Sequence, residues 1–136
     1  MPNSIRYKTY KSQDLPKEIY NQCYKLNFRN GGSMRETLVA VKGGEYMADI
    51  AVCIDGKRVV SWCMRVFKYY PKNTDVFMTY TGKDYRNRGI GSRLYARLDK
   101  KYPKRKSRVI TNDTRAKNFY QSVLNKRRTK VLFERG

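Results

Sequence analysis

The residues best suited to chemistry lie between positions 80 and 94, where the sequence reads YTGKDYRNRGIGSRL. The pattern predicts the end of a strand, then a basic loop with glycines, and then the start of a helix. A helix start offers unpaired backbone N–H groups and a partial positive charge. Glycine lets the backbone approach a ligand closely. Together these features predict a site for a phosphate or diphosphate group.

Arginines strengthen this prediction, because Arg86, Arg88 and Arg93 add charged hydrogen-bond donors around the loop. The stretch is not a Walker loop, since no Gly-Lys-Ser or Gly-Lys-Thr follows. It is not a dinucleotide fingerprint either, since the third glycine after Gly89 and Gly91 is missing. The competing interpretation is a charged, solvated turn before a helix.

Apolar periodicity predicts the elements that position this loop. Asp14 is a candidate cap for the first helix, and the Asp55-Gly56 pair between two apolar runs indicates a hairpin. Strands are expected at 5–10, 46–54, 58–67, 75–81, 108–111 and 130–133. Helices are expected at 16–26, 34–41 and 90–102, with another starting near residue 113.

This order predicts an α/β (α+β) fold with a mixed sheet, in which an antiparallel meander is followed by a parallel strand–helix–strand unit. Helices should cover both faces of the sheet. The length of 136 residues, of which 40% are hydrophobic, indicates a single domain over residues 1–136. No apolar stretch suggests a membrane span or a secretory signal, so we expect a soluble cytoplasmic protein.

Composition excludes several kinds of chemistry. The chain contains no histidine, which removes catalytic triads and histidine-bound metals. Its cysteines, Cys23, Cys53 and Cys63, lack metal-ligand spacing, so we expect buried, reduced thiols and no metal.

The formal net charge of +20 is the strongest compositional signal. From Lys83 onward there are 18 basic and 4 acidic residues. Such an excess attracts polyanions. Basic clusters at 100–101, 104–106 and 126–130, on a helix end and in the C-terminal tail, lie beyond the phosphate loop. They predict a nucleic acid or an acidic macromolecule as a partner, although a solvated basic face is the simpler alternative.

Two motifs together resemble the GNAT N-acetyltransferase superfamily. The first is Arg86-x-x-Gly89-x-Gly91 between a strand and a helix, and the second comprises Asn112, Ala116, Phe119 and Tyr120 at the next helix. The resemblance extends over nearly the whole chain, because the predicted order of elements agrees with that family.

The resemblance implies acetyl-CoA as the cosubstrate, with roles for particular residues. Tyr120 would be the general acid that protonates the departing thiolate, a role compatible with a phenol. Packing of Tyr120 in the core is the alternative. The cofactor would be bound by the loop, by the end of the preceding strand and by the second motif, through Tyr80, Thr81, Arg86, Arg88, Gly89, Ile90, Gly91, Ser92, Arg93 and Asn112.

The general base and the acceptor are left open by the sequence. Glu36, Glu45, Asp49 and Asp75 are candidate bases, and a water-relayed base is another option. A Gly-Phe pair typical of the family does not follow Tyr120. We therefore expect a shortened last hairpin, whose exposed strand could pair in a homodimer.

These observations predict an acyl-CoA-dependent N-acyltransferase, most simply an acetyltransferase, that acts on a primary amine. The acceptor would be carried by an anionic macromolecule, such as an aminoacyl-tRNA, a nucleic-acid-associated protein or an acidic protein. The alternatives are a weak or inactive module of the same fold that binds nucleic acid or an acidic protein, and a structural basic protein without a cofactor.

Overall fold

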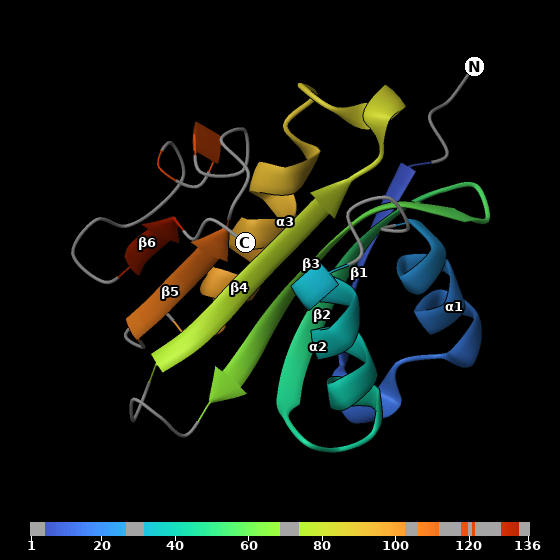
Figure 1. The fold of residues 1–136 in the computed structure, drawn as a ribbon. Helices are drawn as coiled ribbons and strands as arrows, with labels where there is room; N and C mark the ends of the chain where they lie inside the picture. Colours follow the sequence, from blue (N-terminus) through green and yellow to red (C-terminus); the bar gives the residue numbers. More distant parts are fainter. Residues whose placement is uncertain are drawn as a thin grey trace.

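A computed structural model describes residues 5–26, 32–68, 74–102, 106–111, 118–119, 121 and 129–133. Within these residues the chain forms a six-stranded sheet whose spatial order follows the chain, as Figure 1 shows. The strands are β1 (Ile5–Lys11), β2 (Met47–Asp55), β3 (Arg58–Lys68), β4 (Thr74–Thr81), β5 (Lys106–Thr111) and β6 (Thr129–Phe133). The helices are α1 (Lys17–Leu26), α2 (Gly32–Lys42) and α3 (Ile90–Asp99), with short 3-10 turns η1 (Ser12–Asp14) and η2 (Lys83–Tyr85).

The strand directions confirm the predicted mixed sheet. Strands β1 to β4 pair antiparallel, whereas β4 pairs with β5, and β5 with β6, in parallel. Helix α3 connects β4 to β5, which is the predicted parallel unit. Strand β6 lies at an edge of this sheet, and its pairing with a second copy stays a prediction.

The structure differs from the sequence prediction at several element ends. The prediction that Asp14 caps α1 is wrong, because Asp14 lies in η1 and the helix begins only at Lys17, after Pro16. Helix α3 ends at Asp99, before the predicted residue 102, because residues 100–102 form a turn and bend. Helix α2 is longer than the predicted 34–41. The helix expected from residue 113 lies largely outside the described residues, of which 118–119 and 121 are helical.

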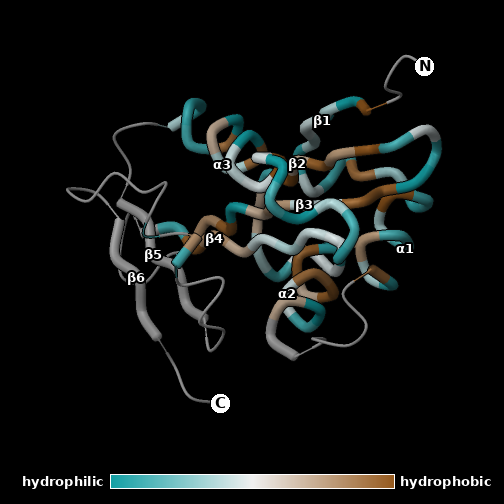
Figure 2. Tube along the Cα trace, turned by 90° about the horizontal axis from the view of Figure 1, so that it is seen from above, coloured by the Kyte–Doolittle hydropathy of each residue, from teal (hydrophilic) through white to brown (hydrophobic). Residues whose placement is uncertain are grey.

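The sheet is buried on both faces, which explains why β2 and β3 are almost continuously apolar. Alternate side chains point to opposite faces. In β2, Ile50 and Val52 join one cluster with residues of α1 and α2, while Ala51 and Cys53 join another with residues of α3. Figure 2 shows α3 on one side of the sheet and α1 and α2 on the other, so the prediction of helices on both faces is confirmed.

A β-bulge in β3 shapes the end of β4. Cys53 pairs with Ser61 and Ile54 pairs with Val59, so Val60 is the extra residue. Its carbonyl accepts a hydrogen bond from the Gly82 N–H at 2.8 Å. The bulge therefore anchors the chain where it leaves β4 for the basic loop.

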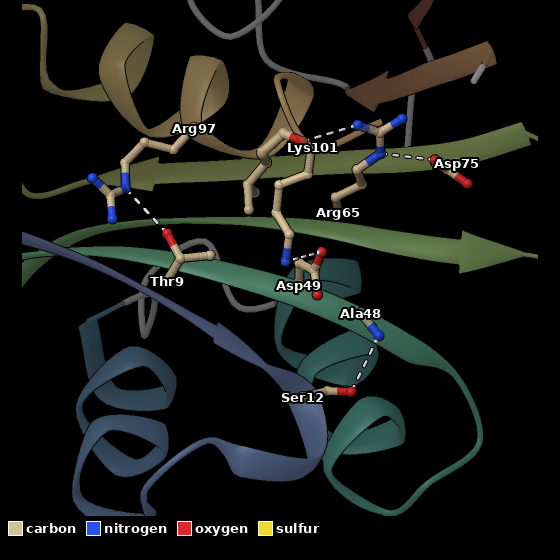
Figure 3. Close-up of polar contacts among 9 residues, drawn as sticks. Thr9, Ser12, Ala48, Asp49, Arg65, Asp75, Arg97 and Lys101 are labelled. Atoms are coloured by element: carbon tan, nitrogen blue, oxygen red, sulfur yellow. Dashed lines mark hydrogen bonds and ion pairs between the residues drawn. The ribbon is translucent and has the colours of Figure 1, made fainter. Parts of the chain in front are cut away.

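A buried arginine fixes the other end of α3, as Figure 3 shows in part. Arg65 Nε lies 2.7 Å from Asp75 Oδ2, and both side chains are fully buried. The same guanidinium donates to the carbonyl of Leu98 at 3.0 Å and to that of Tyr102 at 3.1 Å. These bonds satisfy carbonyls at the helix end and counter its partial negative charge.

Candidate functional site

The ladder between β4 and β5 ends before either strand does. The pairing runs only from Thr74 opposite Lys106 to Phe77 opposite Val109, yet β4 continues to Thr81 and β5 continues to Thr111 along β6. Residues 78–81 of β4 therefore lie beyond the last pair with β5. Alternate N–H and C=O groups of this segment point away from β3. They can pair with an extended ligand as a strand would.

The N-terminus of α3 follows this strand end through the basic loop, as can be traced in Figure 1. Gly89 is the N-cap, with φ of 76° and ψ of 7°, in the left-handed region that favours glycine. Because the cap is a glycine, it has no side chain to cover the N–H groups of the first turn. A Cβ at this position would meet no atom of the described residues within 4 Å. A helix start capped by a glycine, with space beside the cap, is the kind of place at which proteins bind anions.

Gly91 brings the two sequence motifs together. A Cβ added there would lie 3.2 Å from the ring of Phe119 and 3.7 Å from the hydroxyl of Thr81. The half-buried Phe119 also packs against the core on the α3 side of the sheet. The second motif therefore adjoins the first turn of α3 and the end of β4, and any side chain at position 91 would press on the Phe119 ring.

Polar contacts hold the end of β4 in place. Arg86 Nε donates to the Thr81 carbonyl at 3.1 Å, and its guanidinium lies 5.8 Å from the centre of the Tyr80 ring. Ser61 Oγ donates to the Tyr80 carbonyl at 3.0 Å and lies 2.8 Å from the Thr81 hydroxyl oxygen. Sequence reasoning missed Ser61, because only the β3–β4 register places it opposite Thr81.

The loop that follows is braced through Tyr85, the aromatic residue of η2. Its hydroxyl donates to the Asp55 carboxylate and accepts a bond from Arg58 at 3.1 Å. The exposed Arg88 lies 5.2 Å from the centre of the same ring. These contacts tie the loop to the hairpin between β2 and β3, and they leave Arg88 at the surface beside the helix start.

Arg93 is directed toward β1 instead. Its guanidinium lies 5.9 Å from the centre of the Tyr7 ring. Burial raises the pKa of Tyr7, and the nearby Cys53 raises it further, while Arg93 opposes both. Ile90 is buried in the core and Ser92 is half-buried. The groups with which these two residues could contact a ligand of the loop are therefore mainly their backbone N–H groups.

The four candidate bases divide into two kinds. Glu36 and Glu45 are exposed. Asp75 is fully buried against Arg65, and Asp49 lies 3.1 Å from Lys101 Nζ. Arg65, which pairs with Asp75, is separated from Ser61 by about 13 Å along β3. Both aspartates therefore serve as partners in ion pairs away from the basic loop.

Two predicted site residues, Tyr120 and Asn112, lie outside the described residues. In the part of the chain that is described, no group of three His, Cys, Asp or Glu side chains could hold a metal ion. Within the same residues, no helix is both long enough and apolar enough to cross a membrane. The cysteines Cys23, Cys53 and Cys63 are buried as predicted.

Comparison with known proteins identifies the family of this chain. The sequence profile of the acetyltransferase (GNAT) family matches residues 7–125. Since the match spans most of the chain, the chain belongs to the GNAT family and is an N-acetyltransferase. The family uses acetyl-CoA, and the open helix start beside a strand edge fits that molecule's diphosphate and extended arm. No curated protein matches the sequence.

Several solved acetyltransferases share the fold at low identity. One is AAC(6')-Iy in complex with a bisubstrate analog, CoA-S-monomethyl-acetylneamine, with a TM-score of 0.66, 12% identity, and coverage of 96% of this chain and 98% of that one. A second is the aminoglycoside acetyltransferase meta-AAC0020 from an uncultured soil metagenomic sample. Its TM-score is 0.64 and its identity 15%, and the match covers 90% of this chain and 89% of that one. A third is the ribosomal-protein-alanine N-acetyltransferase from Brucella melitensis biovar Abortus 2308. Its TM-score is 0.63 and its identity 13%, and the match covers 88% of this chain and 90% of that one. At these identities the likeness shows the fold alone.

Proposed function

We propose that this protein transfers an acetyl group from acetyl-CoA to a primary amine of an acceptor carried by an anionic macromolecule in the cytoplasm. It would act as a single domain over residues 1–136. The parting of β4 from β5 beside the open N-terminus of α3 is the observation that carries the proposal. The pantetheine arm would pair with residues 78–81, which include Tyr80 and Thr81. The diphosphate would accept bonds from backbone N–H groups between Arg88 and Arg93.

Arg86 and Arg88 would have different duties in this site. The bond from Arg86 to the Thr81 carbonyl supports a positioning role for its side chain. The exposure of Arg88 beside the helix start supports direct contact with phosphate oxygens. Asn112 would contact the pantetheine arm, as the family resemblance implies.

The transfer reaction needs a neutral amine, a polarised carbonyl and a protonated leaving group. Backbone N–H groups at the end of β4 would polarise the thioester carbonyl. The amine nitrogen attacks the carbonyl carbon, the C–S bond breaks, and the thiolate takes a proton from the Tyr120 hydroxyl. A water-relayed base would accept the proton that the amine loses. Tyr120 follows Phe119 in the sequence, and the closeness of the Phe119 ring to Gly91 supports the assignment.

The charge of the protein supports an anionic carrier for the acceptor. With a net charge of +20, the protein repels free polycations and attracts polyanions. An aminoacyl-tRNA, a nucleic-acid-associated protein and an acidic protein all satisfy this condition. A free aminoglycoside does not, although one of the structural relatives described above, meta-AAC0020, is an aminoglycoside acetyltransferase.

A weak or inactive binding module is the second candidate. This candidate is favoured because none of the four candidate bases is placed as a general base would be. Asp49 and Asp75 are held in ion pairs, and the other two are exposed. This module would bind nucleic acid or an acidic protein, and it would release little or no free CoA from acetyl-CoA in the presence of an acceptor.

A labelling experiment tests the proposed function. The protein is incubated with radiolabelled acetyl-CoA and a cell extract, and the macromolecules are then treated with ribonuclease or protease. We expect acid-precipitable label that one of the two treatments releases. Label found only in small molecules would contradict the anionic carrier. An absence of transferred label, with acetyl-CoA still bound, would favour the module.

Tyr120→Phe tests the proposed acid. Loss of the hydroxyl should slow thiol release from acetyl-CoA by about 100-fold or more, while acetyl-CoA binding measured by calorimetry changes little. Phe119→Leu is a matched control for packing, because it alters the contact with Gly91 but removes no proton donor. Unchanged thiol release in Tyr120→Phe would overturn the assignment.

A further inference from the structure

A basic cleft lies at the opposite end of α3 from the acetyl-CoA site. Its volume is about 570 Å³, it is open to solvent, and it is lined by the end of β1, by η1, and by the end of α3 with the turn that follows it. The lining residues are Thr9, Tyr10, Lys11, Asp14, Arg97, Lys100 and Lys101. Among the described residues of the lining, cations therefore outnumber acids, and they converge from two parts of the chain that are far apart in the sequence.

Structural duties account for only part of this charge. Lys101 forms the ion pair with Asp49, and Arg97 Nε donates to the neutral Thr9 hydroxyl at 3.1 Å, as Figure 3 shows. Among the described residues, Lys11 and Lys100 have no carboxylate within ion-pair distance.

Lysines near a helix C-terminus are often explained by the partial negative charge there. The carbonyl of Leu98 in α3 and that of Tyr102, just after the helix, are already bonded by the buried Arg65. The exposed cations of the cleft are therefore not needed to complete the helix end, and their charge remains available to a ligand.

The cations also continue beyond the cleft as a row. Arg93, Arg97 and Lys100 are exposed and recur every three or four residues, so they share one face of α3. This row is about 10 Å long, and the whole helix places the cleft about 15 Å from the acetyl-CoA site. An extended polyanion could therefore occupy the cleft and follow the helix.

The lining favours a phosphate backbone over an acidic peptide. Protein–protein contacts gain affinity from apolar or aromatic anchors that fill pockets, whereas nucleic-acid interfaces are more polar and more positively charged. Among the described residues of the lining, Tyr10 is the only aromatic one, and its side chain packs against the core on the α1 and α2 side. Tyr10 is therefore partly occupied within the protein, and the charged groups of the described lining are the ones best placed to bind a ligand.

We propose that this cleft, together with the exposed row on α3, binds the phosphodiester backbone of a nucleic acid without reading its sequence. The inference deepens the proposed function, because it rests on the idea that an anionic macromolecule carries the acceptor. It names that macromolecule as a nucleic acid and places its docking surface at the β1–α3 cleft.

Fluorescence anisotropy with a labelled oligouridine of about 20 nucleotides tests this site. The test variant is Lys11→Gln/Lys100→Gln. The control is Lys17→Gln/Lys25→Gln, which removes the same charge from exposed positions of α1 on the other face of the sheet. The plot of log affinity against log salt should become shallower by about 1.4 in the cleft variant, because each lost phosphate contact contributes about 0.7. The control should keep the slope of the unmodified protein.

Three results would overturn the docking site. These are equal slopes for the two variants, a flat salt response of the unmodified protein, or tighter binding of a polyglutamate peptide than of oligouridine. Calorimetry with acetyl-CoA separates this failure from failure of the proposed function. Both variants should bind acetyl-CoA as the unmodified protein does. A loss of acetyl-CoA binding in the cleft variant alone would show that the two sites are not separate.

Discussion

Gly89 shows most directly how a single residue would shape the proposed acetyl-CoA site. Its positive φ makes the turn into α3, and no described atom lies within 4 Å of where its side chain would begin. A larger residue there meets two penalties, which are backbone strain and occupation of the space that a diphosphate needs.

Gly89→Glu should lower acetyl-CoA affinity by about 100-fold or more in calorimetry, because the carboxylate competes with and repels the diphosphate. Gly44→Glu is a matched control. Gly44 also has a positive φ, of 85°, and open space around it, but it follows α2, which packs on the other face of the sheet. Both variants should lose similar stability. Equal losses of affinity would show that strain, rather than contact with the ligand, explains the effect.

For single residues, the sequence predicted those whose role depends only on their neighbours along the chain. Gly89 and Gly91 could be predicted because a helix start and a glycine are local features. Ser61 and the Tyr85–Asp55 bond could not, because they depend on which residues the β2–β3–β4 register brings together. Asp75 was a candidate base from the sequence, whereas its burial against Arg65 depends on the packing of α3 on the sheet.

Among the elements, α3 matters most because its two ends do different work. The N-terminus has no side-chain cap and is the proposed ligand site, whereas Arg65 binds a carbonyl of the C-terminal turn from inside the molecule. A fully buried guanidinium is costly unless its donors are satisfied. Here its described partners are one carboxylate, one carbonyl in the last turn of α3 and one carbonyl in the turn that follows, so the arginine fixes the helix end to the sheet.

Arg65→Lys should lower the free energy of unfolding by about 2 kcal/mol, because an ammonium cannot reach all three acceptors in this arrangement. Urea denaturation followed by circular dichroism measures the change. Arg58→Lys, at an exposed position in the same strand, should leave the denaturation midpoint nearly unchanged. A similar shift of the midpoint in both variants would contradict the role assigned to Arg65.

The elements themselves were largely predictable because their periodicity is strong. Runs of apolar residues around Asp55-Gly56 identified β2 and β3, and Ile90, Leu94 and Leu98 identified α3. The ends were less predictable. Asp14 has the residue type of a helix cap, but η1 takes up that part of the chain before α1 begins. The early end of the β4–β5 ladder has no signal in either strand alone, since it is a property of their pairing.

Across the whole molecule, the sheet separates two apolar cores, and the cysteines are buried among them. Burial raises the pKa of Cys23 to about 12, and burial likewise raises that of Cys63 to about 12, where Thr79 and Arg65 oppose the shift. Both thiols therefore stay protonated in the folded protein when those of the unfolded chain ionise. Because the unfolded state then holds fewer protons, stability must fall as the pH rises.

We expect the free energy of unfolding to decrease above pH 9.0 and toward about 12, by up to about 1.4 kcal/mol per pH unit for each thiol. Urea denaturation at a series of pH values checks this. The variant Cys23→Ala/Cys63→Ala should show a shallower alkaline decrease, since lysine ionisation still acts on it. The same slope in the variant and in the unmodified protein would contradict the assignment to these thiols.

Amide hydrogen exchange with and without acetyl-CoA tests the central claim most directly, because that claim concerns which backbone groups are open. Saturating acetyl-CoA should slow exchange in residues 78–81 of β4 and at the first turn of α3, and leave α1 unchanged. Protection confined to other elements, or none at these two segments while acetyl-CoA is bound, would contradict the proposed site.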